Sequence, residues 1–119
     1  MLTKLEDLPE GVIGFEAHGK LTAKEYEMTL IPEALAALEQ GDVRLLFILG
    51  DDFAGFELGA VWDDTMFGLR EHFVFDRIAI ITASSVLAGL IHSLAFLIPG
   101  DVHVFKPENI QRAMTWLLA

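Results

Sequence analysis

Two pairs of adjacent carboxylates, Asp51-Asp52 and Asp63-Asp64, are the residues of this chain whose chemistry would suit acid–base catalysis. A carboxylate pair works in catalysis when both groups converge on one substrate atom and the pKa of one of them is shifted. Successive helix residues point roughly 100° apart, so Asp63 and Asp64, which fall in a predicted helix, cannot both face one atom. We therefore interpret both pairs as solvent-exposed carboxylates.

The other candidates for chemistry have simpler explanations. The stretch 14–20, GFEAHGK, is close to a phosphate-binding loop, but Leu21 stands where that loop needs Ser or Thr, and residues 15–18 fit a strand. Ser84 and Ser85 lack the surrounding glycines of a nucleophile elbow and suit the start of a helix. The sequence therefore predicts no catalytic residue and no bound nucleotide.

The chain has four histidines and no cysteine. Thiolate chemistry, disulfides and cysteine-ligated zinc are excluded by composition, and the absence of cysteine fits a reducing, cytoplasmic location. The histidines lack the i, i+4 spacing with a nearby acid that helical zinc sites show, so we expect no metal and no cofactor. The four are His18, His72, His92 and His103.

The composition also limits the class of protein. The chain has 119 residues, of which 53% are hydrophobic, a mean hydropathy of +0.46 and a formal net charge of −10, which favour one domain over residues 1–119. Its bases are scattered singly, which argues against binding to nucleic acid or to anionic membrane surfaces. The most apolar stretch, 86–98, would span about 20 Å as a helix, short of the ~30 Å hydrocarbon layer, so we expect no integral membrane association. The excess of apolar residues predicts a homo-oligomer.

The hydrophobic patterns predict a hairpin followed by alternating strands and helices. Thr22 and Glu25 form a capping box at a helix start, Gly41 suits the end of that helix, and Pro32 should kink it. Residues 43–49, VRLLFIL, are a nearly continuous apolar run typical of a central strand covered on both faces. The expected fold class is α/β, with a mixed, mostly parallel five-stranded sheet, an N-terminal antiparallel hairpin and four helices in the order ββαβαβαβα. The predicted strands cover residues 3–8, 12–18, 43–49, 77–82 and 102–105, and the predicted helices cover 22–40, 57–73, 86–98 and the segment from 107 onward.

The best candidate binding site is the predicted loop 50–57, which follows the central strand. Ligands of open α/β sheets bind beyond the carboxyl ends of the parallel strands, where this loop would lie. Two phenylalanines on either side of Gly55 would form an apolar lid over a ligand; the alternative is that both rings pack on the core. The predicted ligand-binding residues are Asp51, Phe53, Phe56, Glu57 and Trp62.

The predicted helix 86–98 is the candidate subunit interface. It is apolar apart from His92 and Ser93. A histidine on such a helix is satisfied either by a backbone carbonyl in the core or at a subunit contact, where it would make assembly depend on pH. The predicted interface residues are Leu87, Ile91 and His92.

Several short motifs follow one another in a fixed order along the chain: LPEGVIGF (8–15), GKLTA (19–23) with Tyr26, LIP (30–32), FAGF (53–56) with WDD (62–64), RIA (77–79) and FLIPG (96–100). Together these motifs resemble the SpoIIAA-like family of the STAS superfamily, with its STAS/CRAL-TRIO-like fold. The resemblance covers essentially the whole chain and rests on the order of the motifs, because each motif alone is weak. It implies a module that binds a small ligand or a protein partner, and the likeness to CRAL-TRIO folds implies an apolar ligand.

Sporulation antagonists of this superfamily work through a phosphorylatable serine at the start of the helix after the third strand. The matching segment here is 55–59, GFELG, which has no hydroxyl group and places Glu57 at the helix start. This departure puts a serine switch at that position in doubt.

These observations lead to one functional hypothesis with two alternatives. The leading hypothesis is a non-catalytic binding or regulatory module that holds a small apolar or amphipathic ligand or a protein partner. The first alternative is an enzyme that uses Asp51, Asp52, Glu57 or His18 at the carboxyl ends of the strands. The second is a purely structural interaction domain that docks through the helix 86–98.

Overall fold

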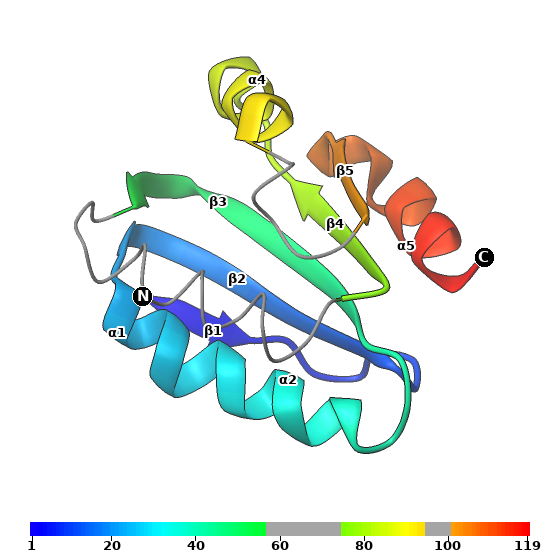
Figure 1. The fold of residues 1–119 in the computed structure, drawn as a ribbon. Helices are drawn as coiled ribbons and strands as arrows, with labels where there is room; N and C mark the ends of the chain where they lie inside the picture. The colour runs from blue at the N-terminus through cyan, green and yellow to red at the C-terminus, as the bar shows by residue number, and fades with distance from the viewer. Residues whose placement is uncertain (57–74, 95–100) are drawn as a thin grey trace.

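The structure is a computed structural model that describes residues 1–56, 75–94 and 101–119 (Figure 1). Its centre is a five-stranded mixed sheet whose strands lie side by side in chain order. The first two strands form an antiparallel hairpin, and the remaining neighbours pair in parallel, which confirms the predicted α/β class and the mixed sheet. The strands are β1 (Leu2–Lys4), β2 (Val12–Leu21), β3 (Arg44–Phe56), β4 (Arg77–Ile81) and β5 (Asp101–Phe105).

Residues 44–49 of the apolar run 43–49 lie in β3, the middle strand, as predicted. Because side chains alternate along a strand, Leu45 and Phe47 face one side of the sheet while Leu46 faces the other. All three are buried, so this part of β3 is covered on both faces. The nearly continuous apolar run is the sequence signature of that position.

The first helical region consists of α1 (Ala23–Glu25), a π-helical turn η1 (Tyr26–Leu30) and α2 (Ile31–Leu38). The Glu25 amide donates to the Thr22 hydroxyl at 3.1 Å, which is the N-terminal half of the predicted capping box. The other half differs, because the Glu25 carboxylate pairs with the amino group of Met1 at 3.2 Å.

The π turn η1 lies just before Pro32, where the sequence predicts a kink. The amide of Ile31 donates to the carbonyl of Tyr26, five residues earlier, where an α-helix would use the fourth. Pro32 has no amide hydrogen and its ring crowds the preceding turn. We attribute the wider turn to the relief of that clash. Gly41 follows α2 with a φ of +136°, consistent with its predicted place after the helix end.

Two further helices lie on described residues. The helix α4 (Ser85–Leu94) begins where the hydroxyl of Ser84 accepts the amide of Leu87 at 3.2 Å, so Ser84 is its N-cap. Near the end of the chain, the 3-10 turn η3 (Pro107–Asn109) leads into α5 (Ile110–Leu118). The proline sits in the first turn, as predicted. The remaining predicted helix, 57–73, lies outside the described residues.

The sheet separates two hydrophobic layers. One layer, which we call the helix-side core, lies between the sheet and the helices α2 and α4; the other lies between the opposite face of the sheet and α5. Figure 1 shows α2 and α5 at separate places around the sheet. The first layer includes Phe15, Leu30, Ala34, Phe47, Ile80 and Ile91. The second includes Val12, Leu46, Ala79, Ile81, Ala113 and Leu117.

Two arginines attach the C-terminal end of α5 to the sheet. Arg44 donates to the carbonyl of Leu117, and Arg77 donates to the carbonyl of Trp116. The guanidinium of Arg77 also lies 5.4 Å from the centre of the Trp116 ring. The last carbonyls of a helix have no partner within the helix, so these cations occupy the end where they stabilise it most.

The structure corrects two predicted boundaries. The first strand is Leu2–Lys4 rather than 3–8. Residues 50–56, predicted as a loop, instead continue β3 and pair with the end of β2. The glycines and aspartates that suggested a turn fit into an irregular ladder, in which Gly19 and Gly55 take positive φ values of 62° and 110°.

No helix among the described ranges is long and apolar enough to cross a membrane.

Candidate functional site

The pairing of β2 with β3 becomes irregular near the carboxyl ends of the two strands. Ala17 lies opposite Leu49, but the next paired residue, Gly19, lies opposite Phe53. Three residues of β3, at 50–52, therefore face a single residue of β2, His18. Such bulges bend a strand and redirect side chains, and they are frequent beside functional sites.

The bulge brings His18 and Asp52 together. Their Nδ1 and Oδ1 atoms are 2.8 Å apart, within hydrogen-bond distance. The Nε2 atom of His18 lies 3.6 Å from the carboxylate of Glu16, two residues earlier on β2. We define the bulge cluster as Glu16, His18, Gly50 and Asp52.

The carboxylates change the protonation of the cluster. The hydrogen bond to Asp52 is the largest cause that raises the pKa of His18 above its ordinary value, and the charge of Glu16 acts in the same direction. The same hydrogen bond lowers the pKa of Asp52. The imidazolium form of His18 is therefore favoured by a carboxylate near each ring nitrogen.

Gly50 completes the bulge cluster because a Cβ atom at its position would be in tight contact with both side chains of the pair. A Cβ atom there would lie 3.0 Å from the Asp52 carboxylate and 3.1 Å from Nδ1 of His18. The close approach of backbone and side chains depends on a residue without Cβ. The glycine thus lets the histidine and the aspartate lie over the backbone of β3.

The His18–Asp52 pair of the bulge cluster is an ion pair at the protein surface. Side-chain exposure is 35% for His18 and 65% for Asp52, so water reaches both groups. The electrostatic effects of such a pair are strongest in a site that excludes water, and this pair lies outside one. Among the described residues, no group of three or more His, Asp and Glu side chains is arranged to hold a metal ion. The sequence named His18 and Asp52 for an enzyme; the structure brings these two together, on the surface.

The predicted ligand-binding residues are only partly described. Phe53 is half-buried and packs against the helix-side core, and Asp51 is exposed. The backbone of Phe56 pairs with Leu21 at the end of β2. The side chain of Phe56, together with Glu57 and Trp62, lies outside the described residues.

The predicted interface residues divide between the inside and the outside of the molecule. Ile91 is buried in the helix-side core, and Leu87 packs against that core, whereas His92 is exposed. The outward apolar residues of α4 are Val86, 80% exposed, and Leu90, 50% exposed. The sequence did not single out these two, because on a helix that is apolar all round the periodicity does not identify the buried side.

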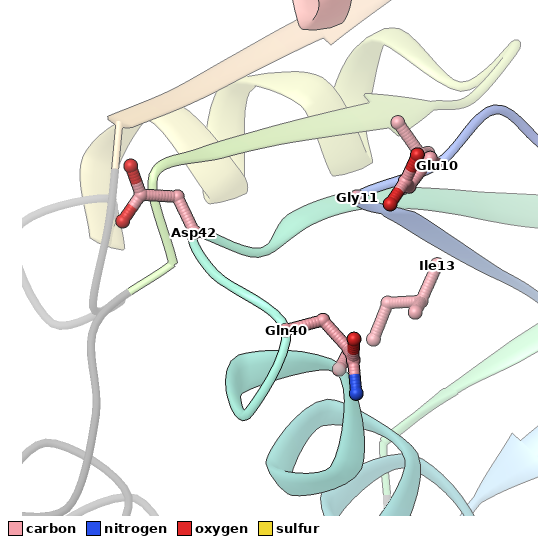
Figure 2. A pocket seen from close by; sticks show the side chains of 7 residues that line it. Glu10, Gly11, Ile13, Gln40 and Asp42 are labelled. Carbon is pink, nitrogen blue, oxygen red and sulfur yellow. The ribbon is translucent and has the colours of Figure 1, made fainter.

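A small hollow lies at the other end of the sheet, where β2 begins and α2 ends (Figure 2). Its volume is about 130 Å³, below the roughly 300–1,000 Å³ of typical ligand pockets. Figure 2 shows Ile13 of β2 and Gln40 after α2 beside it. The full lining is Glu10, Gly11, Val12, Ile13, Ala37, Gln40 and Asp42.

Comparison with known proteins identifies a family and several similar solved structures. The SpoIIAA-like family model matches residues 12–118. A crystal structure of an uncharacterized protein from the DUF3478 family of Shewanella loihica PV-4, described as having a SpoIIAA-like fold, is 28% identical in sequence, with a TM-score of 0.69. The match covers 98% of this chain and 93% of that one. No curated protein matches. Since the family model covers nearly the whole chain, the protein belongs to the SpoIIAA-like family.

Proposed function

We propose that this chain is a non-catalytic binding module that contacts a protein partner through the outward face of α4. A SpoIIAA-like fold suggests a binding or regulatory role. The exposed position of the bulge cluster also favours binding over catalysis. The absence of cysteine supports a cytoplasmic setting for this role.

One observation carries the proposal. Val86 and Leu90, one helical turn apart, expose apolar side chains on the same face of α4. Gly89 and Ser93 are also exposed, and no acidic residue or lysine or arginine lies between Ser85 and Leu94. An uncharged apolar surface on a chain with a net charge of −10 is typical of a contact site.

The alternative is an apolar or amphipathic small ligand at the end of β3, near Asp51, Phe53 and Phe56. The high content of hydrophobic residues supports it. The packing of Phe53 against the protein's own core weighs against it, because a ring committed to the core is not free to cover a ligand. For this reason we place the protein-partner proposal first.

A charge placed on α4 tests the proposal. The double variant Val86→Glu/Leu90→Glu should lose any protein that the wild type retains from an extract of its own cells. The matched control is Met28→Glu/Leu35→Glu, which changes two exposed apolar residues of the first helical region, Met28 in η1 (68% exposed) and Leu35 in α2 (43% exposed). The control should retain the same protein.

Two results would contradict the proposal. Retention of the partner by the α4 variant would place the contact elsewhere. A small molecule recovered by mass spectrometry from denatured wild-type protein, with no protein partner, would favour the ligand alternative.

A further inference from the structure

Among the residues that the structure describes, the strand β5 is an edge of the sheet with no strand beyond it. Within the described residues it pairs with β4 and with no other strand, and Figure 1 shows it as the last strand, on the side away from β1. An edge strand presents unpaired amide and carbonyl groups that another strand can pair with. Proteins commonly protect such an edge with a central lysine, a proline or a bulge. The central residues of β5, Val102 to Val104, have none of these.

The pairing with β4 fixes which backbone groups face outward. The carbonyl of Phe105 accepts the amide of Thr82, just after β4, so the polar groups of Phe105 point toward β4. Successive residues of a strand direct their backbone groups to alternate sides. The amides and carbonyls of Val102 and Val104 therefore point away from the sheet, toward the open edge.

The three central residues of β5 are symmetric about His103. The strand reads Asp-Val-His-Val-Phe, with His103 between two valines. An antiparallel pair of two such strands, centred on His103, sets Val102 of one copy opposite Val104 of the other. These are the residues with outward backbone groups, so each valine pair exchanges two hydrogen bonds. This register satisfies every outward backbone group of the two valines.

We propose that a second copy of this chain binds here, so that two β5 strands pair antiparallel and join two sheets into one. The inference goes beyond the proposed function, because it concerns a different surface from the outward face of α4. Val102 and Val104 are half-buried at the margin of the helix-side core. In the paired form, the valines of the two copies contact across the new ladder and continue that core from one copy into the other.

The charges at the two ends of β5 favour an antiparallel second copy. Asp101 stands at the start of the strand and Lys106 directly after its end. In the antiparallel pair, Asp101 of one copy and Lys106 of the other lie at the same end of the ribbon, on opposite faces, so the opposite charges are near each other without direct contact. A parallel pair would instead set the two aspartates side by side, with like charges opposed.

The aromatic residues on the other face fix the position of the strand. His103 stacks on Trp116 of α5 at 4.2 Å between ring centres, and Phe105 lies 6.0 Å from the same ring. The side chains that face α5 are thus held by their own chain. The edge is presented in a fixed conformation, which reduces the entropy lost on pairing.

The first test needs no substitution. Sedimentation of the purified chain should show a concentration-dependent dimer. Amide hydrogen exchange should then show Val102 and Val104 protected in the dimer and exchanging freely on dilution, while the amide of Phe105, which faces β4, stays protected at both concentrations. A chain that stays monomeric at every concentration, or a dimer in which the two valine amides still exchange freely, would overturn the proposal.

The second test uses a proline. Val104→Pro removes an outward amide from each copy and leaves the ladder with β4 intact, because proline is tolerated where the amide of an edge strand faces solvent. The loss of one hydrogen bond per copy should weaken the dimer about tenfold or more. An unchanged dimer would overturn the proposal.

The α4 double variant separates this inference from the proposed function. Val86→Glu/Leu90→Glu should keep the dimer while losing the protein partner. If that variant becomes monomeric instead, self-association runs through α4 and the β5 assignment is wrong. If it keeps both the dimer and the partner, only the proposed function fails.

Discussion

Replacement of Arg77 by methionine tests how the C-terminal end of α5 is held. The guanidinium of Arg77 donates to the carbonyl of Trp116 and lies 5.4 Å from the centre of its ring. Methionine keeps much of the apolar length of the side chain and removes the charge and the donors. The substitution therefore isolates the polar attachment of α5 from the packing of its buried face.

The expected loss follows from the two contacts. A hydrogen bond from a charged group contributes about 1.5–3 kcal/mol, and a cation–π contact about 0.5–1 kcal/mol. Arg77 is only half-buried, so the lower values apply, and the free energy of unfolding should fall by about 2 kcal/mol. At about 4 °C per kcal/mol for a chain of this size, the Tm should fall by roughly 8 °C.

Urea and thermal unfolding, each followed by circular dichroism, measure this loss. Arg112→Met is the matched control, because Arg112 is an exposed arginine on the same helix and its loss should change stability by less than about 0.5 kcal/mol. The slope of the urea transition should stay unchanged, since the surface exposed on unfolding is the same. Equal Tm values for the two variants would refute the reasoning, because water would then satisfy the end of α5 as well as Arg77 does.

Three further predictions concern the bulge cluster and the core. The raised pKa of His18 means that its pair with Asp52 stabilises the fold fully below the ordinary histidine pKa of 6.5 and loses this effect as the pH rises through the folded-state pKa. The lowered pKa of Asp52 keeps its carboxylate charged, and so preserves the pair, above the ordinary aspartate value of 3.8. His18→Gln should therefore lower the urea midpoint most between pH 3.8 and pH 6.5, and least at about pH 9. A loss of stability that grows with pH would contradict this. Gly50→Ala should push the pair apart and return the pKa of His18 toward 6.5 in an NMR titration of its ring; an unchanged titration would show that the pair tolerates the added Cβ. Leu117→Ala, at a fully buried position, should lower the free energy of unfolding by about 2–5 kcal/mol in urea. Leu118→Ala, at a 49% exposed position, should lower it by less than about 0.5 kcal/mol. Similar losses for the two variants would mean that the buried face of α5 is assigned incorrectly.

The sequence by itself determined the α/β class, the N-terminal hairpin and the mixed five-stranded sheet. These features depend on local patterns. The apolar runs 43–49 and 77–82 supply the residues of β3 before its bulge and all of β4. The hydroxyls of Thr22 and Ser84 each cap the helix that follows that residue. A cap or an apolar run acts through residues next to it in the chain. Such signals can therefore be read before the fold is known.

Tertiary structure alone decided the details of the candidate site. His18 and Asp52 are 34 residues apart, and the pair exists because three residues of β3 face one residue of β2. In the same way, the packing of α4 against the sheet decided that Ile91 faces inward and Val86 outward. Strand register and helix rotation result from contacts between segments that are distant in the chain. The hydrophobic pattern of one segment alone does not determine the free energy of such contacts.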